Sequence, residues 1–241
     1  MVNYKIDVGG GGVFSKYMIA IESLSHVNSN IENVYINVID ERTNNDIFDE
    51  IFNQTFDENY LNLNMVYPNN INNTENHHNL DKYKKIITKF SFKKELIEEI
   101  EGYQKSLCID ENTVGVHVRL TDMNIYHLSD YGYSDFNSYL NRLNKTDNYF
   151  VASDNEESLN KLIEIFGDKI KYVPNLIRTK NEKEDSLNLQ LTNFKNKNFW
   201  KESFIEMMLL SKCGSLICRT SCLASASIIH SNTIKNIIRI K

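Results

Sequence analysis

Residues 113–122 read Thr-Val-Gly-Val-His-Val-Arg-Leu-Thr-Asp, and this stretch decides the fold of the second half of the chain. The alternation of valines with other residues predicts a buried β-strand over 113–119. It also places His117 and Arg119 on the same face, so both polar side chains emerge together at the carboxyl end of the strand. An arginine there can grip a diphosphate with two N–H groups, and a histidine can donate or accept a hydrogen bond. An ion pair between Arg119 and Asp122 at the strand end is the alternative interpretation, and the pattern favours neither.

Strands and helices alternate through the rest of this half, over about 130 residues. This order predicts an α/β domain with a doubly wound, mostly parallel sheet, in which ligands bind at the carboxyl ends of the strands. The other predicted strands cover residues 149–153, 169–173, 215–218 and 234–240, and the predicted helices cover residues 134–143, 156–166, 201–212 and 221–230.

The first half of the chain opens with a strand, a glycine turn and a helix. The apolar pattern of residues 3–8 predicts a strand, which the four glycines Gly9 to Gly12 follow directly. Apolar residues then recur at helical spacing over 14–24, which predicts a helix. A second strand at 33–39 completes a βαβ unit with a right-handed crossover. The glycine run, with Asp40 after the second strand, resembles the nucleotide loop and ribose-binding acid of S-adenosylmethionine-dependent methyltransferases or of dinucleotide-binding enzymes. Glycine loops alone are weak evidence, so this function is kept as an alternative.

Two further segments place polar residues where strands end. Asp154 follows the predicted strand 149–153, and it either caps the next helix or acts as a functional carboxylate. Glu206 stands in an otherwise apolar helical stretch. Thr220 and Ser221 open the last predicted helix, whose first backbone N–H groups can bind a phosphate. An ordinary N-cap at Ser221 is the alternative interpretation.

Composition limits what the chain binds. Its 27 Lys and Arg against 32 Asp and Glu give a net charge of −5, which argues against general attraction to nucleic acid or to anionic membranes. Apolar runs end well before the roughly 18 residues that a membrane-spanning helix needs, and the N-terminus does not resemble a signal peptide. The four cysteines form no CxxC pair and have no histidine at ligand spacing. We therefore expect buried thiols, no metal site and a cytoplasmic protein.

Taken together and in this order, these segments resemble the motifs of the α1,6- and related fucosyltransferases, the superfamily that includes the bacterial Nod-factor enzyme and the protein O-fucosyltransferases. Residues 117–122, 150–155 and 206–221 are similar to its first, second and third motifs. The resemblance covers residues 113–231 and reaches the first half through the glycine run. It implies a GT-B fold, in which two Rossmann-like domains face a cleft. The implied domains are residues 1–110, on the acceptor side and with the glycine-rich loop, and residues 111–241, which bind the nucleotide-sugar donor.

The resemblance also implies an activity. It is the metal-independent transfer of L-fucose from GDP-fucose, with inversion, to a glycan or another hydroxyl acceptor, and no cofactor takes part. Arg119 would bind the β-phosphate of GDP and act in catalysis together with Asp122, and Glu206 would pair with guanine. The implied donor-binding residues are His117, Arg119, Asp154, Glu206, Thr220, Ser221, Gly10, Gly11 and Gly12.

Two of the chain's departures from the pattern of this superfamily bear on its activity. Leu120 stands where a second arginine is usual, and we expect no neighbouring cation to compensate for it. The general base that would activate the acceptor is not evident, with Asp122, Asp130 and Asp135 as candidates. A non-catalytic GDP-sugar-binding protein is therefore a further alternative.

Overall fold

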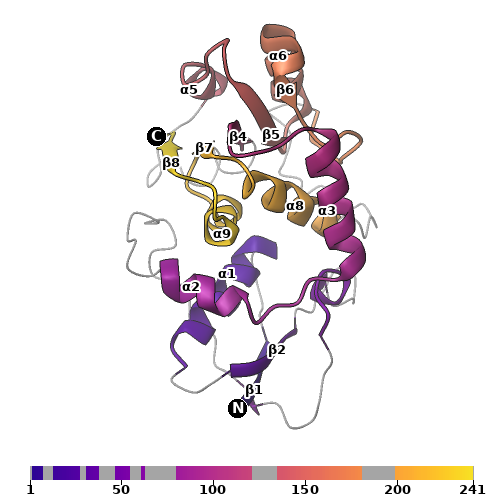
Figure 1. Ribbon diagram of the computed structural model, residues 1–241, viewed down its shortest axis with the longest axis vertical. Coiled ribbons are helices and arrows are strands. Elements are labelled where there is room, and N and C mark those ends of the chain that lie inside the picture. Colours follow the sequence, from indigo (N-terminus) through magenta and orange to yellow (C-terminus); the bar gives the residue numbers. More distant parts are fainter. Residues whose placement is uncertain are drawn as a thin grey trace. The chain divides into compact units, whose positions relative to one another are not determined.

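The computed structural model shows two compact units, Met1–Glu98 and Glu99–Lys241 (Figure 1). Each unit contains its own parallel β-sheet together with helices, which confirms the predicted α/β class. The structure describes residues 2–7, 13–27, 31–37, 47–54, 61–62, 80–120, 135–180 and 199–240.

The first unit begins with the predicted βαβ arrangement. β1 (Val2–Asp7) and β2 (Ile31–Asn37) are parallel, and α1 (Val13–Ser25) lies between them in the chain. A two-residue strand that the sequence did not predict, β3 (Leu61–Asn62), pairs with the other edge of β1. α2 (Leu80–Ile87) packs against α1. The predictions for Gly10, Gly11, Gly12 and Asp40 lie outside the described residues.

The second unit contains a five-stranded, all-parallel sheet with the strand order β6-β5-β4-β7-β8. Counted along the chain this order is 3-2-1-4-5, which is that of a doubly wound nucleotide-binding domain. The winding reverses between β4 and β7, and such folds bind ligands outside the carboxyl ends of the strands at that point. The strands are β4 (Thr113–Val118), β5 (Asn148–Ser153), β6 (Ile170–Lys171), β7 (Ser215–Cys218) and β8 (Asn236–Arg239). The helices are α3 (Lys94–Ser106), which begins in the first unit, α5 (Phe136–Leu140), α6 (Glu156–Phe166), α8 (Phe199–Leu210) and α9 (Cys222–His230).

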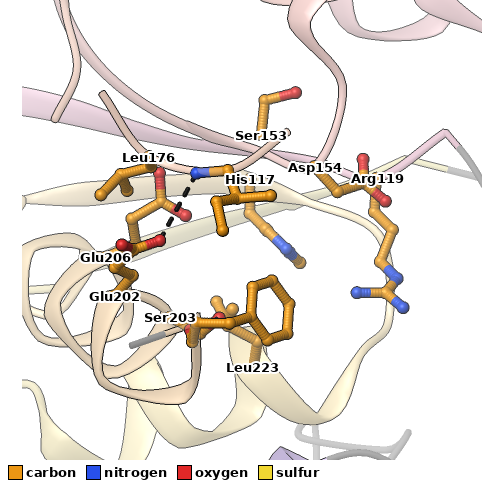
Figure 2. Close-up of a pocket in the computed structure, with 11 residues that line it drawn as sticks. His117, Arg119, Ser153, Asp154, Leu176, Glu202, Ser203, Glu206 and Leu223 are labelled. Carbon is orange, nitrogen blue, oxygen red and sulfur yellow. Dashed lines mark hydrogen bonds between the residues drawn. The ribbon is translucent and has the colours of Figure 1, made fainter. Parts of the chain in front are cut away.

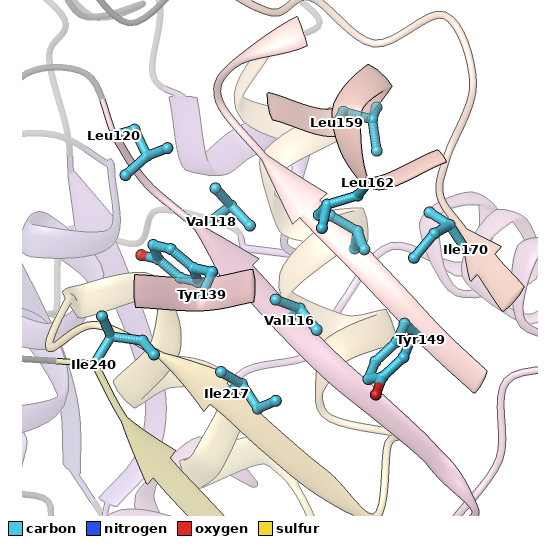
Figure 3. Packing of buried hydrophobic residues seen from close by; sticks show 11 residues of the cluster. Val116, Val118, Leu120, Tyr139, Tyr149, Leu159, Leu162, Ile170, Ile217 and Ile240 are labelled. Atoms are coloured by element: carbon cyan, nitrogen blue, oxygen red, sulfur yellow. The ribbon is translucent and has the colours of Figure 1, made fainter. Parts of the chain in front are cut away.

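The alternation along β4 divides its packing between the two faces of the sheet. Val116 lies on one face, in an apolar cluster that includes Tyr139 of α5 (Figure 3). On the other face, a β-carbon in place of Gly115 would lie only 3.0 Å from Leu210 Cδ2 of α8. Both faces are therefore covered, as in other buried parallel sheets. His117 shares the face of Gly115, so its side chain lies on the side of the sheet covered by α8.

The structure corrects two details of the sequence analysis. The helix predicted over 134–143 is shorter, because Asp135 is its N-cap and accepts a hydrogen bond from Ser138 N, and the helix ends at Leu140. None of the four cysteines forms a disulfide, and the expectation of buried thiols holds for Cys213 and Cys218 only, because Cys108 is exposed and Cys222 is half-buried. Within the part of the chain that the structure describes, no helix is long and apolar enough to cross a membrane.

Candidate functional site

A pocket lies at the carboxyl ends of β4 and β5, beside the point where the winding of the sheet reverses. Its walls come from these strand ends, from the segment that follows β6 and from α8 and α9. Four of the predicted site residues line it, namely His117, Arg119, Asp154 and Glu206. The sequence pattern therefore brings these four side chains into one site. Asp122, like the glycine run, lies outside the described residues.

The charged side chains of this pocket lie in two groups, one at each end. Glu202 and Glu206 of α8 lie at one end, Arg119 and Asp154 lie at the other, and His117 lies between them (Figure 2). Carboxylates accept hydrogen bonds and guanidinium groups donate them. A ligand that matches this arrangement carries N–H donors at one end and negative charge at the other.

His117 is buried, with 4% of its surface exposed, and its Nδ1 lies 3.3 Å from Ser221 Oγ. Burial, followed by the positive charges of Arg119 and Arg239, lowers the pKa of His117 to about 3. The imidazole is therefore neutral at physiological pH. A neutral imidazole offers one donor and one acceptor nitrogen, so His117 can hydrogen-bond a ligand without adding charge.

Two backbone hydrogen bonds hold the chain where it leaves β4. Arg119 N donates to the Tyr139 hydroxyl at 3.3 Å, and Leu120 N donates to Asp154 Oδ1 at 3.4 Å. These contacts hold the main chain from which Arg119 reaches the pocket. The side chain of Leu120 is fully buried in the apolar cluster on the opposite face of the sheet. Position 120, for which the sequence analysis noted a leucine in place of an expected arginine, is therefore a core position in this protein.

The interpretation of Asp154 as a helix cap is wrong. The N-cap of α6 is Asn155, whose side chain accepts a hydrogen bond from Ser158 N at 2.7 Å. Asn155 N donates to Ser153 Oγ at 3.1 Å, which holds this turn in place. The helix cap therefore lies one residue later in the chain than the sequence analysis expected. Asp154 instead lines the pocket and accepts from Leu120 N.

Glu206 is paired with Arg178, a residue that the sequence analysis missed. Arg178 Nη2 donates to Glu206 Oε1 at 3.0 Å, and the two side chains are only 6% and 12% exposed. Burial raises the pKa of Glu206 to about 7; Arg178 opposes this rise, and the charges of Asp154 and Glu202 add to it. Arg178 lies in the segment that follows β6, so a search for charged residues after the carboxyl ends of the strands could have identified it.

Ser221 is the N-cap of α9, and its Oγ accepts from Ala224 N at 3.1 Å. The N-cap interpretation is thus confirmed. The same hydroxyl contacts His117, so the cap touches a pocket residue, although Ser221 and Thr220 do not themselves line the pocket. Thr220 is half-buried directly before it, after β7. The backbone N–H groups at the start of α9 lie close to the reversal point, where they favour an anion.

The expectation that no neighbouring cation compensates for Leu120 stays a prediction, but a further arginine, Arg239, lies near His117. Arg239, the last residue of β8, stands beside Cys218 in the strand register, and Cys218 stands beside His117. Arg239 Nη1 donates to Cys218 Sγ at 3.1 Å and to Arg219 O at 3.3 Å. The positive charge of Arg239 is close enough to lower the pKa of His117.

Comparison with known proteins gives similarity at the level of structure. No family model and no curated protein matches the sequence. A solved structure of the fucosyltransferase NodZ from Bradyrhizobium is similar, with a TM-score of 0.59 and 11% identity over 99% of this chain and 95% of that chain. NodZ alpha-1,6-fucosyltransferase soaked with GDP-fucose gives a TM-score of 0.56 and 11% identity over 96% of this chain and 93% of that chain. The same enzyme co-crystallised with GDP gives a TM-score of 0.56 and 12% identity over 99% of this chain and 95% of that chain. This likeness confirms the expected fold.

Proposed function

We propose that this protein is a metal-independent fucosyltransferase that transfers L-fucose from GDP-fucose, with inversion, to a glycan or another hydroxyl acceptor. The observation that carries the proposal is the arrangement of charged groups in the pocket, with Glu202 and Glu206 at one end, Arg119 beside Asp154 at the other and His117 between them. The fold of NodZ, which has been co-crystallised with GDP and soaked with GDP-fucose, supports this choice of donor.

The acidic end suits guanine. The Watson–Crick edge of guanine has two adjacent donors, N1–H and the N2 amino group, and a carboxylate accepts both at once. Adenine presents an acceptor at the corresponding ring nitrogen, and uracil lacks the amino group. Glu206 as an ionised acceptor therefore favours GDP over ADP and UDP.

The basic end suits the diphosphate. Arg119 offers a fork of N–H donors, and Ser221 with the first N–H groups of α9 offers further donors close by. Negative charge grows on the β-phosphate as the sugar leaves, so donors already in place stabilise the transition state more than the ground state. We assign the charge neutralisation to these groups instead of a metal ion, and Asp154 to a hydroxyl of the donor.

The reaction is a single displacement. The acceptor oxygen bonds to the anomeric carbon of fucose from the face opposite GDP, and the bond between that carbon and the β-phosphate oxygen breaks with its electron pair left on GDP. The acceptor proton passes to a carboxylate, for which Asp122 is our choice. Thr220 and the glycines Gly10, Gly11 and Gly12 stay predicted donor-binding residues.

A thermal-shift panel tests the donor. GDP, GDP-fucose, ADP, UDP and S-adenosylhomocysteine are compared in EDTA, where a specific ligand at 100 times its Kd stabilises the protein by about 2.7 kcal/mol. We expect GDP and GDP-fucose to stabilise the protein far more than the others, and we expect Glu206→Gln to lose this preference. Equal shifts with all nucleotides would contradict the proposal, and a shift confined to S-adenosylhomocysteine would support a methyltransferase.

The buried side chain of Leu120 favours one second candidate, a GDP-sugar-binding protein without catalytic activity. With an apolar core residue at this position, the diphosphate lacks the contact that a second arginine would make. Release of GDP from GDP-fucose, with and without simple sugar acceptors, separates the two functions. Binding without any release of GDP supports the non-catalytic protein.

A further inference from the structure

Arg178 directly follows the pocket-lining residues Leu176 and Ile177 in the chain, and four hydrogen bonds hold it in place. Besides Glu206, it donates to three backbone carbonyls, from Nε to Ser153 O at 3.1 Å, from Nη1 to Leu176 O at 3.4 Å and from Nη2 to Val173 O at 3.2 Å. These partners lie at the end of β5 and in the segment after β6. The guanidinium is therefore held by the main chain, and it in turn holds Glu206 at a fixed place on α8.

This arrangement controls both the direction and the charge of Glu206. Arg178 binds Oε1, which orients the carboxylate in the pocket wall. A buried carboxylate without a partner takes up a proton, and a protonated carboxyl has a donor where guanine also has donors. An ionised Glu206 therefore depends on Arg178.

We propose that Arg178 is a positioning residue that sets the preference of the pocket for guanine, by holding Glu206 in the orientation and charge state that accept the guanine N1–H and N2 amino group. This proposal rests on the proposed function, because it takes a guanine nucleotide as the ligand. Arg178 acts through Glu206 and need not touch the base.

The other charged groups around Glu206 determine how its pKa changes when Arg178 is removed. Glu202 lies one turn earlier on α8, Asp154 follows β5, and both raise the pKa of Glu206, whereas Arg178 lowers it. His117 of β4 is neutral, and Arg119 lies at the opposite end of the pocket. When Arg178 is removed, the remaining charged groups that act on Glu206 are the carboxylates of Glu202 and Asp154. The pKa of Glu206 therefore rises, and Glu206 ionises at higher pH.

The test compares GDP with inosine diphosphate, which lacks only the 2-amino group. Calorimetry gives the ratio of the Kd of inosine diphosphate to the Kd of GDP. It is measured from mildly acidic to mildly alkaline pH, below the range in which the base N1–H ionises. A charge-assisted hydrogen bond to the amino group predicts a ratio of at least about tenfold in the natural protein. We expect this ratio to rise with pH as Glu206 ionises.

In Arg178→Met, we expect the ratio at neutral pH to fall to about twofold or less and its rise to move to higher pH. Arg178→Lys keeps the charge but not the fork, so its ratio should be intermediate. Arg142→Met, which removes an exposed arginine of the same unit, is the matched control and should change nothing. A purely structural role for Arg178 would weaken both nucleotides equally at every pH, and this result would overturn the proposal.

A double-mutant cycle keeps the test decisive if Arg178→Met fails to fold. Glu206→Gln together with Arg178→Met leaves no unpaired buried charge, which is usually tolerated. If Arg178 acts through Glu206, the double variant has the same nucleotide ratio as Glu206→Gln alone. A further fall in the ratio would overturn the proposal. Absence of GDP binding to the natural protein would instead contradict the proposed function itself.

Discussion

His117 Nδ1 and Ser221 Oγ lie 3.3 Å apart, and this contact joins the end of β4 to the N-cap of α9 at the point where the winding of the sheet reverses. The imidazole is buried, and Arg119 and Arg239 are near enough to disfavour its protonated form. His117 is thus a neutral hydrogen-bonding group at the centre of the pocket.

The buried histidine predicts how stability depends on pH. Between about pH 3 and the ordinary value of 6.5, unfolded His117 binds a proton that folded His117 does not, so acid favours unfolding. The raised pKa of Glu206 acts in the opposite sense between 4.5 and about 7. We expect His117→Gln to make the free energy of unfolding fall less steeply toward acid pH, by up to roughly 1.4 kcal/mol per pH unit. Urea unfolding at several pH values, followed by fluorescence of the single tryptophan, Trp200 of α8, measures this slope, and an unchanged slope would contradict the prediction.

Periodicity was sufficient to predict the sheet of the second unit, because β4, β5, β7 and β8 are apolar strands bounded by polar residues. It also predicted which strand ends carry His117, Arg119 and Asp154, since parallel strands place their carboxyl ends on one edge. These are properties of each segment by itself, and a sequence displays them directly.

Contacts between distant segments could not be predicted in this way. Arg178 and Glu206 are 28 residues apart, and the segment that contains Arg178 has no period from which a side-chain direction follows. The choice between Asp154 and Asn155 as helix cap depends on one residue of register after β5. The two residues of β3 are too few to show alternation.

Arg119→Ala tests the basic end of the pocket. Loss of a charge-assisted hydrogen bond to phosphate should weaken GDP by roughly 10- to 150-fold. Arg119→Lys should recover part of this loss, because an ammonium keeps the charge without the fork. Turnover should fall more than GDP affinity, since charge on the diphosphate grows as fucose leaves. Calorimetry and a GDP-release assay measure the two effects, with Arg142→Ala as the exposed control. Unaltered GDP affinity in a folded Arg119→Ala protein would contradict the assignment.

Asp154 and Asn155 are neighbours with separate predicted effects. Asn155→Ala removes the cap of α6 and should lower the free energy of unfolding by about 1 kcal/mol with little change in nucleotide affinity. Asp154→Asn keeps the size of the side chain and removes its charge, so GDP-fucose affinity should fall while stability changes less. Denaturation measures the free energy of unfolding of each variant, and calorimetry measures the affinity of each for GDP-fucose. The assignment of Asp154 to the ligand fails if Asn155→Ala weakens GDP-fucose as much as Asp154→Asn does.

Gly214 is required by close backbone approach before β7. A β-carbon at Gly214 would lie 1.8 Å from the backbone oxygen of Glu111, a contact that no side-chain movement relieves. Gly214 N also donates to Thr113 O at 3.0 Å, next to the start of β4, so a shift here disturbs the strand that carries His117. Gly214→Ala should therefore destabilise the protein by about 3 kcal/mol or more.

Gly102→Ala is the matched control for this last prediction. Gly102 lies inside α3, and a β-carbon added there would meet nothing within 4 Å beyond the backbone of its own helix. Alanine loses less conformational entropy than glycine on folding, so this substitution should stabilise the protein by about 0.5–1 kcal/mol. Unfolding curves from Trp200 fluorescence should then shift in opposite directions for the two glycines. A Gly214→Ala protein as stable as Gly102→Ala would show that the backbone contact between Gly214 and Glu111 does not constrain the fold.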